Sequence, residues 1–276
     1  MMNQIAASEQ VVAVGGRDQP LNEALLADIR AYWNEHIHDL EIATHPIGSA
    51  GFFQELDEYR FDKLRYLPVL VDFSAYRGKK LLEVGCGVGI DLVRFARGGA
   101  LVTGVDLAEV SIDLAKQNFT QNGLEADLRV MNGERLLFED DSFDVVYAHG
   151  VLQYTADARQ MIAELYRVLK PGGATIMMVY NRISWLNFLS KVMSVGLEHE
   201  DAPVLNKYSI GEFTEMLTPF SGVRIVPERF PVETRLHSGL KALLYNKLFV
   251  KSFTLLPRSI VGRYGWHLMA FSTKGI

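Results

Sequence analysis

The sequence LLEVGCGVG at Leu81–Gly89, followed by IDLVRFA at Ile90–Ala96, decides the fold. Its apolar start is typical of a buried strand, and the closely spaced glycines indicate a turn before a helix. Because glycine has no Cβ, the backbone of such a turn can lie close to a ligand. The free N–H groups at the start of the following helix point toward the same place. The stretch therefore predicts a site for a nucleotide-type cofactor.

The composition limits the class of protein. The chain has 276 residues, of which 49% are apolar and 22% charged, so it can bury a sizeable core as a globular protein. A formal net charge of -5 argues against a general nucleic-acid binder. The single cysteine, Cys86, excludes an intramolecular disulfide and a cysteine-rich metal site. Without a signal-peptide pattern or an apolar run long enough to span a bilayer, we expect a cytoplasmic protein.

From residue 80 onward, strand and helix patterns alternate. This alternation predicts an α/β, Rossmann-like fold with a seven-stranded, mostly parallel sheet and helices on both faces. Strands are expected at residues 80–84, 101–105, 127–131, 143–147, 174–179, 223–226 and 267–272. Helices are expected at residues 90–96, 109–118, 156–169, 185–195 and 210–217, the third of them stopped by the sequence LKPGG at 169–173.

The N-terminal residues 1–70 form a separate part of the pattern, with a leader followed by helical runs. Apolar residues repeat at helical spacing over 21–37 and again over 52–67, where Pro68 is expected to end the second helix. These runs precede the first core strand, so we expect a helical cap over the cofactor site. Residues 71–276 would then form the main domain, with a second cap inserted at about 181–207.

The glycine turn and the following acid leave the cofactor open. The spacing Gly85-x-Gly87-x-Gly89 lacks the glycine expected three residues after the second in the dinucleotide fingerprint. Asp106 ends the second strand, where a carboxylate that binds ribose hydroxyls is expected. Dinucleotides and other adenosine cofactors both carry a ribose diol, so this acid does not distinguish between them.

Three further motifs follow in order: MNGE at 131–134, DDSFDVVYAHGVLQY at 140–154, and LKPGG at 169–173. Together with the glycine turn and Asp106, they resemble the class I S-adenosylmethionine-dependent methyltransferases, in the group similar to the quinone-biosynthesis methyltransferases. The resemblance covers roughly residues 80–179. It implies methyl transfer from S-adenosyl-L-methionine, with S-adenosyl-L-homocysteine as product, to a small-molecule acceptor.

The resemblance also implies which residues contact the cofactor. Its methionine end would lie against Gly85, Cys86 and Gly87. Glu83 would hold the turn or reach a water near the amino group. His149, after the fourth strand, would line the same moiety.

The adenosine end has its own expected contacts. Asp106 would accept hydrogen bonds from both ribose hydroxyls, and Leu107 would pack on the adenine. Asn132, followed by Gly133, stands where the family usually has an aspartate that reads the adenine amino group. An amide oxygen can accept the same hydrogen bond. Tyr59 of the predicted cap is a further candidate for a cofactor contact.

The catalytic candidates are the side chains that could accept or orient a proton. In-line methyl transfer needs a base only when the acceptor carries a proton that must leave. His36, His149 and Tyr154 are candidates, although each has a plain structural role open to it as surface, pocket wall or packing residue. The family often has Glu-His or His-His where this chain has Gln153-Tyr154, and glutamine cannot act as a base.

Two charged stretches are further candidates for binding sites. Adjacent residues rarely converge on one ion, so the acidic run at 198–201 is expected to be a solvated loop and no metal is predicted. After Glu233 the chain has no acidic side chain, and a basic stretch follows that could hold an anionic substrate or touch a membrane surface peripherally. Its basic residues are Arg235, Lys241, Lys247, Lys251, Arg258, Arg263 and Lys274.

Three rival functions remain at this point: a nicotinamide dehydrogenase, a methyltransferase for a macromolecule or lipid, and a cofactor-binding protein without catalysis. The methylated atom, the need for a base and the oligomeric state are left open by the sequence.

Overall fold

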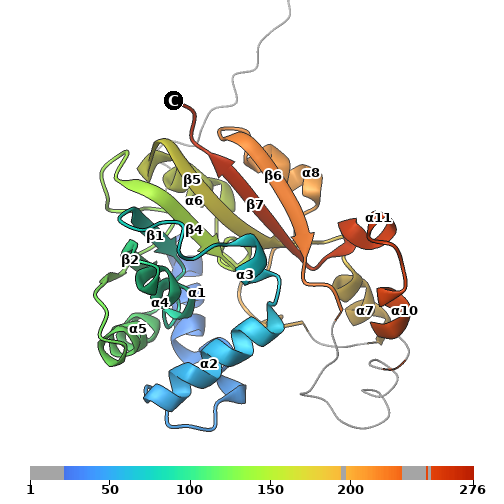
Figure 1. The fold of residues 1–276 in the computed structure, drawn as a ribbon, viewed down its shortest axis with the longest axis horizontal. Coiled ribbons are helices and arrows are strands. Elements are labelled where there is room, and N and C mark those ends of the chain that lie inside the picture. Colours follow the sequence, from blue (N-terminus) through green and yellow to red (C-terminus); the bar gives the residue numbers. More distant parts are fainter. Residues whose placement is uncertain (1–21, 194–196, 232–246, 248–249) are drawn as a thin grey trace, which may run out of the picture.

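The computed structural model describes residues 22–193, 197–231, 247 and 250–276 (Figure 1). They form one seven-stranded sheet in the order β3-β2-β1-β4-β5-β7-β6. β7 is antiparallel to both of its neighbours, and the other neighbouring strands are parallel. This confirms the fold class predicted from the sequence. The strands are β1 Lys80–Val84, β2 Leu101–Asp106, β3 Asp127–Val130, β4 Phe143–His149, β5 Leu169–Tyr180, β6 Ser221–Glu228 and β7 His267–Thr273.

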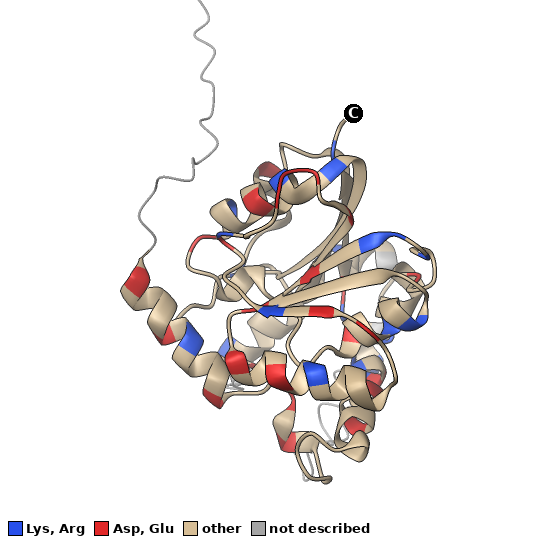
Figure 2. Cartoon of the chain, turned by 90° about the vertical axis from the view of Figure 1, so that its left-hand side faces the viewer, with Lys and Arg blue, Asp and Glu red and all other residues tan. Residues whose placement is uncertain are grey.

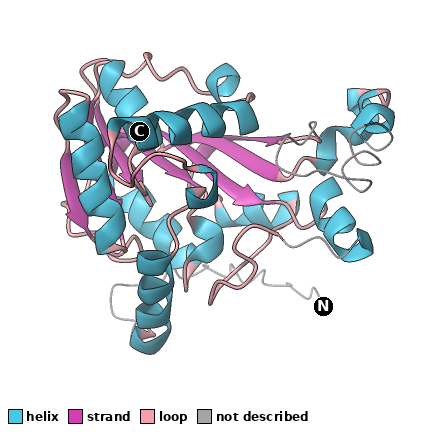
Figure 3. Cartoon of the chain, turned by 90° about the horizontal axis from the view of Figure 1, so that it is seen from below, coloured by secondary structure: helices cyan, strands magenta, loops and turns pink. Residues whose placement is uncertain are grey.

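Helices cover both faces of the sheet (Figure 3). They are α1 Glu23–Glu35, α2 Ala50–Lys63, α3 Leu67–Leu70, α4 Ile90–Arg97, α5 Glu109–Gln121, α6 Ala158–Val168, α7 Trp185–Met193, α8 Ile210–Met216, α10 Lys251–Thr254 and α11 Arg258–Val261. The described residues also form the 3-10 turns η1 Leu40–Ile42, η2 Leu152–Tyr154 and η4 Gly262–Tyr264.

The alternation of side chains along β1 explains why the sheet needs two covered faces. Leu82 belongs to a core with Leu165 of α6, whereas its neighbour Leu81 belongs to a second core with Phe95 of α4. Both leucines are fully buried. Successive strand residues point to opposite faces, so an uninterrupted apolar strand requires a helix layer on each side.

Two boundaries differ from the sequence prediction by more than three residues. β5 begins at Leu169, because the LKPGG segment continues as strand: Leu169 pairs with Phe143 of β4, and the register shifts before Val145. Pro68 does not end a long helix. α2 ends at Lys63, and Pro68 lies in the first turn of α3, where its missing N–H costs no hydrogen bond.

The N-terminal helices lie on the main sheet domain. α1 contacts α5, and α2 contacts both α4 and α5. Arg94 of α4 donates two hydrogen bonds, of 2.7 and 2.8 Å, to the Asp57 carboxylate of α2. Residues 1–21, which include the predicted leader at 1–20, are outside the described residues. The domain boundary at residue 70 and the role of both caps stay predictions.

Charge is mixed over the surface. On the face shown in Figure 2, acidic and basic residues lie interspersed along the helices. Arg235 and Lys241 of the basic C-terminal stretch are outside the described residues, and Lys274 is paired with Asp141 at 2.7 Å. None of the helices among the described residues is long and apolar enough to cross a membrane.

Candidate active site

The glycine turn between β1 and α4 has a backbone that requires glycine. Gly85, Gly87 and Gly89 have φ angles of 71°, 51° and 79°, a region that other residues seldom adopt. A Cβ on Gly85 would also lie 2.6 Å from the Cβ of Val151. The backbone N–H of Gly85 donates to the carbonyl oxygen of Val105, at 2.8 Å. The turn is therefore held against the end of β2.

Asp106 fixes the same turn from β2. One oxygen of its carboxylate accepts from the Gly87 N–H and the other from the Ala108 N–H, both at 2.9 Å. Burial raises the pKa of the Asp106 carboxyl above its usual value. A carboxylate has about four lone-pair directions, so these two bonds leave Asp106 able to accept further hydrogen bonds.

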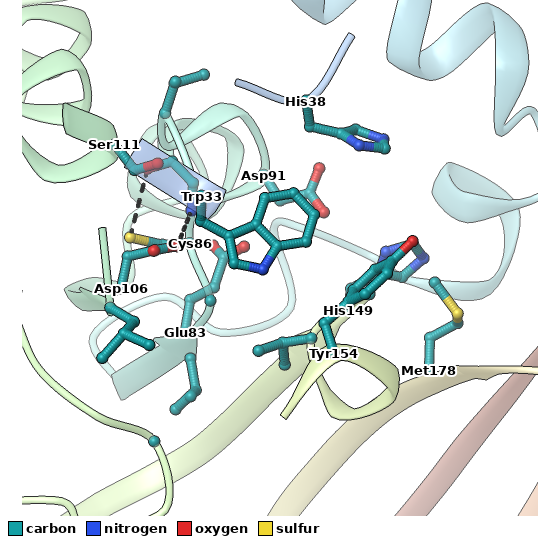
Figure 4. Close-up of a pocket in the computed structure, with 18 of the residues that line it drawn as sticks. Trp33, His38, Glu83, Cys86, Asp91, Asp106, Ser111, His149, Tyr154 and Met178 are labelled. Atoms are coloured by element: carbon teal, nitrogen blue, oxygen red, sulfur yellow. Dashed lines mark hydrogen bonds between the residues drawn. The ribbon is translucent and has the colours of Figure 1, made fainter. Parts of the chain in front are cut away.

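A cavity of about 210 Å³ lies at the carboxyl ends of the parallel strands, the usual position of ligands in such sheets (Figure 4). Of the residues predicted to contact the cofactor, all but one line it: Glu83, Gly85, Cys86, Gly87, Asp106, Leu107, Asn132, Gly133 and His149. The exception is Tyr59. The next residue of α2, Arg60, lines the cavity instead. Successive residues of a helix point about 100° apart, so Tyr59 and Arg60 cannot both face the cavity in the same way.

Glu83 provides a test of whether a ligand fits here. Its side chain is 4% exposed, and its Oε2 atom has no hydrogen-bond partner among the described residues. Burial, with the nearby charges of Asp91 and Asp106, raises the pKa of Glu83 well above its usual value. A buried polar atom without a partner is costly. A ligand with an amino group would supply that partner, so the residues present fit an amino acid-bearing cofactor.

Asp91, in the first turn of α4, joins the N-terminal part to the site. Arg60 donates to both Asp91 oxygens, at 2.6 and 2.5 Å, and Tyr147 donates to one of them at 2.7 Å. The Asp91 side chain is 1% exposed. The Arg60 guanidinium helps to hold the pKa of Asp91 below its usual value, against the effect of burial. Sequence reasoning missed Asp91. The one feature of the sequence that could have indicated it is an acidic residue two positions after Gly89.

His149 lies beside this ion pair and His267 lies beside Arg229, and in each ring the neighbouring arginine determines which nitrogen carries the proton. Arg60 donates to His149 Nδ1 at 3.2 Å, so the proton of that ring is on Nε2, which faces the Tyr66 oxygen at 3.3 Å. Arg229 donates to His267 Nε2 at 3.1 Å, so His267 Nδ1–H faces the same oxygen at 2.5 Å. Both nitrogens of both rings are engaged.

The contacts of the His149 ring make it a poor candidate for a general base. Burial and the Arg60 charge lower the pKa of His149 to about 3, so the ring is neutral at physiological pH. It could take a proton only after losing the bond from Arg60. His267 is 2% exposed, and burial holds its pKa well below the usual value. This residue, which begins the last strand, was not predicted from the sequence as a site residue. Both histidines are suited to positioning rather than proton removal.

The two other catalytic candidates also line the cavity. The Tyr154 hydroxyl lies 3.3 Å from both the Tyr180 hydroxyl and the Glu198 carbonyl oxygen, and burial raises its pKa. The His36 ring stacks on Tyr32, with centroids 4.0 Å apart, and its Nδ1 donates to the Tyr32 carbonyl at 2.8 Å. The structure thus brings His36, His149 and Tyr154 to one cavity.

Residues 82–177 match a family described as a methyltransferase domain. The chain is 32% identical over 154 residues to a ubiquinone biosynthesis O-methyltransferase from Bartonella tribocorum, a match that covers 52% of this chain and 62% of the relative. A protein of the same name from Maricaulis maris is 38% identical over 110 residues, covering 40% and 43%. The chain thus matches less than two thirds of the length of these relatives.

Solved structures share the fold. The YcgJ protein of Bacillus subtilis superposes with a TM-score of 0.56 at 16% identity, over 77% of this chain and 99% of that one. A SAM-dependent methyltransferase from Methanosarcina mazei gives a TM-score of 0.53 at 21% identity, over 76% and 98%. The matched residues 82–177 include the glycine turn and the later motifs that line the cavity, and the seven-stranded, mostly parallel sheet is that of the predicted fold. Over residues 82–177 the chain carries a match to the methyltransferase domain, and its fold is similar to that of S-adenosylmethionine-dependent methyltransferases.

Proposed function

We propose that this protein transfers the methyl group of S-adenosylmethionine to a small-molecule acceptor. The observation that carries the proposal is that one cavity joins the cofactor motifs to side chains from the N-terminal helices and from β7. The names of the matched relatives support a small acceptor. The N-terminal helices that line the cavity also favour a small acceptor over a macromolecule.

The cofactor assignments follow from the groups that line the cavity. Glu83 would bind the amino group of the methionine moiety. Asp106 would accept the ribose hydroxyls through its remaining lone pairs, a charge-assisted contact. Leu107 and Asn132, with Gly133, would border the adenine. Asn132 Oδ1 already accepts from the Glu134 N–H at 2.9 Å, so its amide NH₂ is the group more available to the base.

Both predicted caps contribute to the acceptor end. Trp33 and Lys63 come from the N-terminal helices, and Glu198 comes from the segment predicted as the second cap. Trp33 packs edge-to-face against Tyr154, with ring centroids 5.0 Å apart (Figure 4 shows both). These contacts support the division into a methyltransferase domain and covering segments.

The chemistry assigned to the protein is positioning. The bound cofactor would supply a methyl group on a sulfonium, which is transferred in line to the acceptor. The chain would hold the two reactants together and exclude water, an effect worth up to about 7–11 kcal/mol. Since the lowered pKa makes His149 a weak base and both its nitrogens are engaged, we infer that the acceptor nucleophile is one that needs no proton removed by this ring.

Transfer can be tested with a cell extract separated by size. The full-length protein is incubated with methyl-labelled S-adenosylmethionine and either the low-molecular-weight fraction or the macromolecular fraction. We expect label in one or a few small products, identified by mass spectrometry. Label confined to protein, nucleic acid or lipid would contradict the small-molecule assignment, and binding of cofactor without any transfer would favour a non-catalytic protein.

A further inference from the structure

Four charged side chains from separate segments meet at the acceptor end of the cavity. They are Asp39, Lys63, Glu198 and Arg229, and all four line it. Lys63 Nζ lies 2.6 Å from an Asp39 oxygen and 3.6 Å from a Glu198 oxygen. Arg229 donates to both Glu198 oxygens, at 2.6 and 3.4 Å. The Glu198 carboxylate therefore lies between two cations.

Glu198 differs from the other three in burial. Its side chain is 34% exposed, compared with 10% for Asp39, 11% for Lys63 and 13% for Arg229. The two cations and Asp39 thus form the fixed wall, while Glu198 is the most accessible member. The Arg229 guanidinium already presents two N–H groups to a carboxylate, the paired geometry that recognises this group.

Backbone strain is concentrated at the same place. Four non-glycine residues in the described part of the chain have positive φ angles. Asp39 at 60° and Arg229 at 58° belong to the charged group, and His199 at 51° follows Glu198; only Asp141 lies elsewhere. Such backbone costs about 1–3 kcal/mol per residue and tends to collect at functional sites, where the surrounding structure holds it.

The balance of charge indicates what the site would bind. With Glu198 withdrawn, Lys63 would keep its partner Asp39, and Arg229 would face the cavity without the carboxylate it now binds. A buried cation without a partner is strongly unfavourable, so another carboxylate entering the cavity would restore the balance. Arg229 also donates to His267, so an anion bound there would lie beside the histidine pair.

We propose that Arg229 and Lys63 bind a carboxylate group of the methyl acceptor, which displaces Glu198 from between them. The acceptor is then a small carboxylic acid whose apolar part lies against Trp33, Met178 and Tyr180, which line the same cavity. The proposal rests on the proposed function, since it names the substrate class of that site. It assigns to Glu198 the place that the substrate carboxylate takes.

The test is a titration of the full-length protein with benzoate and with benzamide, its uncharged analogue, by calorimetry. We expect wild-type protein to bind benzoate more tightly than benzamide. Glu198→Gln should tighten benzoate binding severalfold, because a competing carboxylate is removed. Arg229→Gln should weaken it about tenfold or more. Neither change should alter benzamide binding appreciably.

Arg224→Gln is the matched control. Arg224 lies on β6, five residues before Arg229. It is exposed, its guanidinium lies 4.5 Å from the Phe271 ring, and it is not among the described residues that line the cavity. It should leave both affinities unchanged. Lys63→Met supplies a second test if Arg229→Gln does not fold, and should also weaken benzoate binding.

Two results would overturn the proposal: benzoate binding no tighter than benzamide in wild type, or weaker or unchanged benzoate binding in Glu198→Gln. The titrations are made with and without S-adenosylhomocysteine. If methyl transfer fails while the benzoate preference and its response to Glu198→Gln remain, the proposed function is wrong and the carboxylate site stands.

Discussion

Asp106→Ala is expected to weaken S-adenosylhomocysteine binding by about 100-fold or more. The reason is the loss of two charge-assisted hydrogen bonds to the ribose, each worth about 1.5–3 kcal/mol. The substitution also removes the acceptor of the Gly87 and Ala108 N–H groups, while the backbone bond from Gly85 to Val105 still holds the glycine turn against β2. Isothermal titration calorimetry on the folded variant measures the effect.

Asp106→Asn separates the two roles of this side chain. Its amide oxygen can still accept a backbone N–H, but it lacks the charge, so affinity should fall between wild type and Asp106→Ala. Asp113→Ala removes a carboxylate that is 70% exposed, on α5, and should leave binding unchanged. Wild-type affinity in Asp106→Ala would remove the ribose assignment.

Arg60→Met is expected to have the largest effect on stability, lowering the free energy of unfolding by about 3–5 kcal/mol. It leaves the Asp91 carboxylate, which is 1% exposed, without its cation. Tyr147 alone would then donate to that carboxylate among the contacts described here. Urea unfolding followed by circular dichroism measures the change.

The double variant Arg60→Met/Asp91→Leu tests the cause, since removing both charges should restore much of the lost stability. Arg65→Met is the control: the Arg65–Asp62 pair joins side chains that are 64% and 45% exposed, and its loss should change stability little. Equal destabilisation by Arg60→Met and Arg65→Met would show that the Arg60–Asp91 pair has no special role.

Much of the fold could be predicted because its signals are local. Each predicted strand of the sheet is present, with ends that move by a few residues. The start of β5 could not be predicted. Pro171 and the glycines after it oppose a helix but do not exclude a strand, and only the pairing of Leu169 with Phe143 on β4 decides the outcome. The short helix α3 was not predicted for a related reason: a proline such as Pro68 can stand at the start of a helix as well as after its end.

The cofactor end of the site was predictable for a topological reason. Residues that follow parallel strands meet at one edge of the sheet, so motifs far apart in sequence line one cavity. The acceptor end was not. Arg229 directly follows β6 and His267 begins β7, and they reach the cavity because β7 inserts between β5 and β6. No motif marks them in the sequence.

Tyr59 and His149 show a second limit. The sequence placed a helix near the cofactor but not its rotation, which brings Arg60 rather than Tyr59 to the cavity. It suggested a histidine in the pocket but could not show that an arginine would occupy one ring nitrogen and lower its pKa. Both features depend on tertiary packing.

The central claim is that the glycine-turn cavity binds S-adenosylmethionine rather than a dinucleotide. Calorimetric titration of the full-length protein with S-adenosylhomocysteine and, separately, with NADH tests it most directly. We predict saturable binding of one S-adenosylhomocysteine per chain and no measurable binding of NADH. Binding of NADH without affinity for S-adenosylhomocysteine would contradict the account.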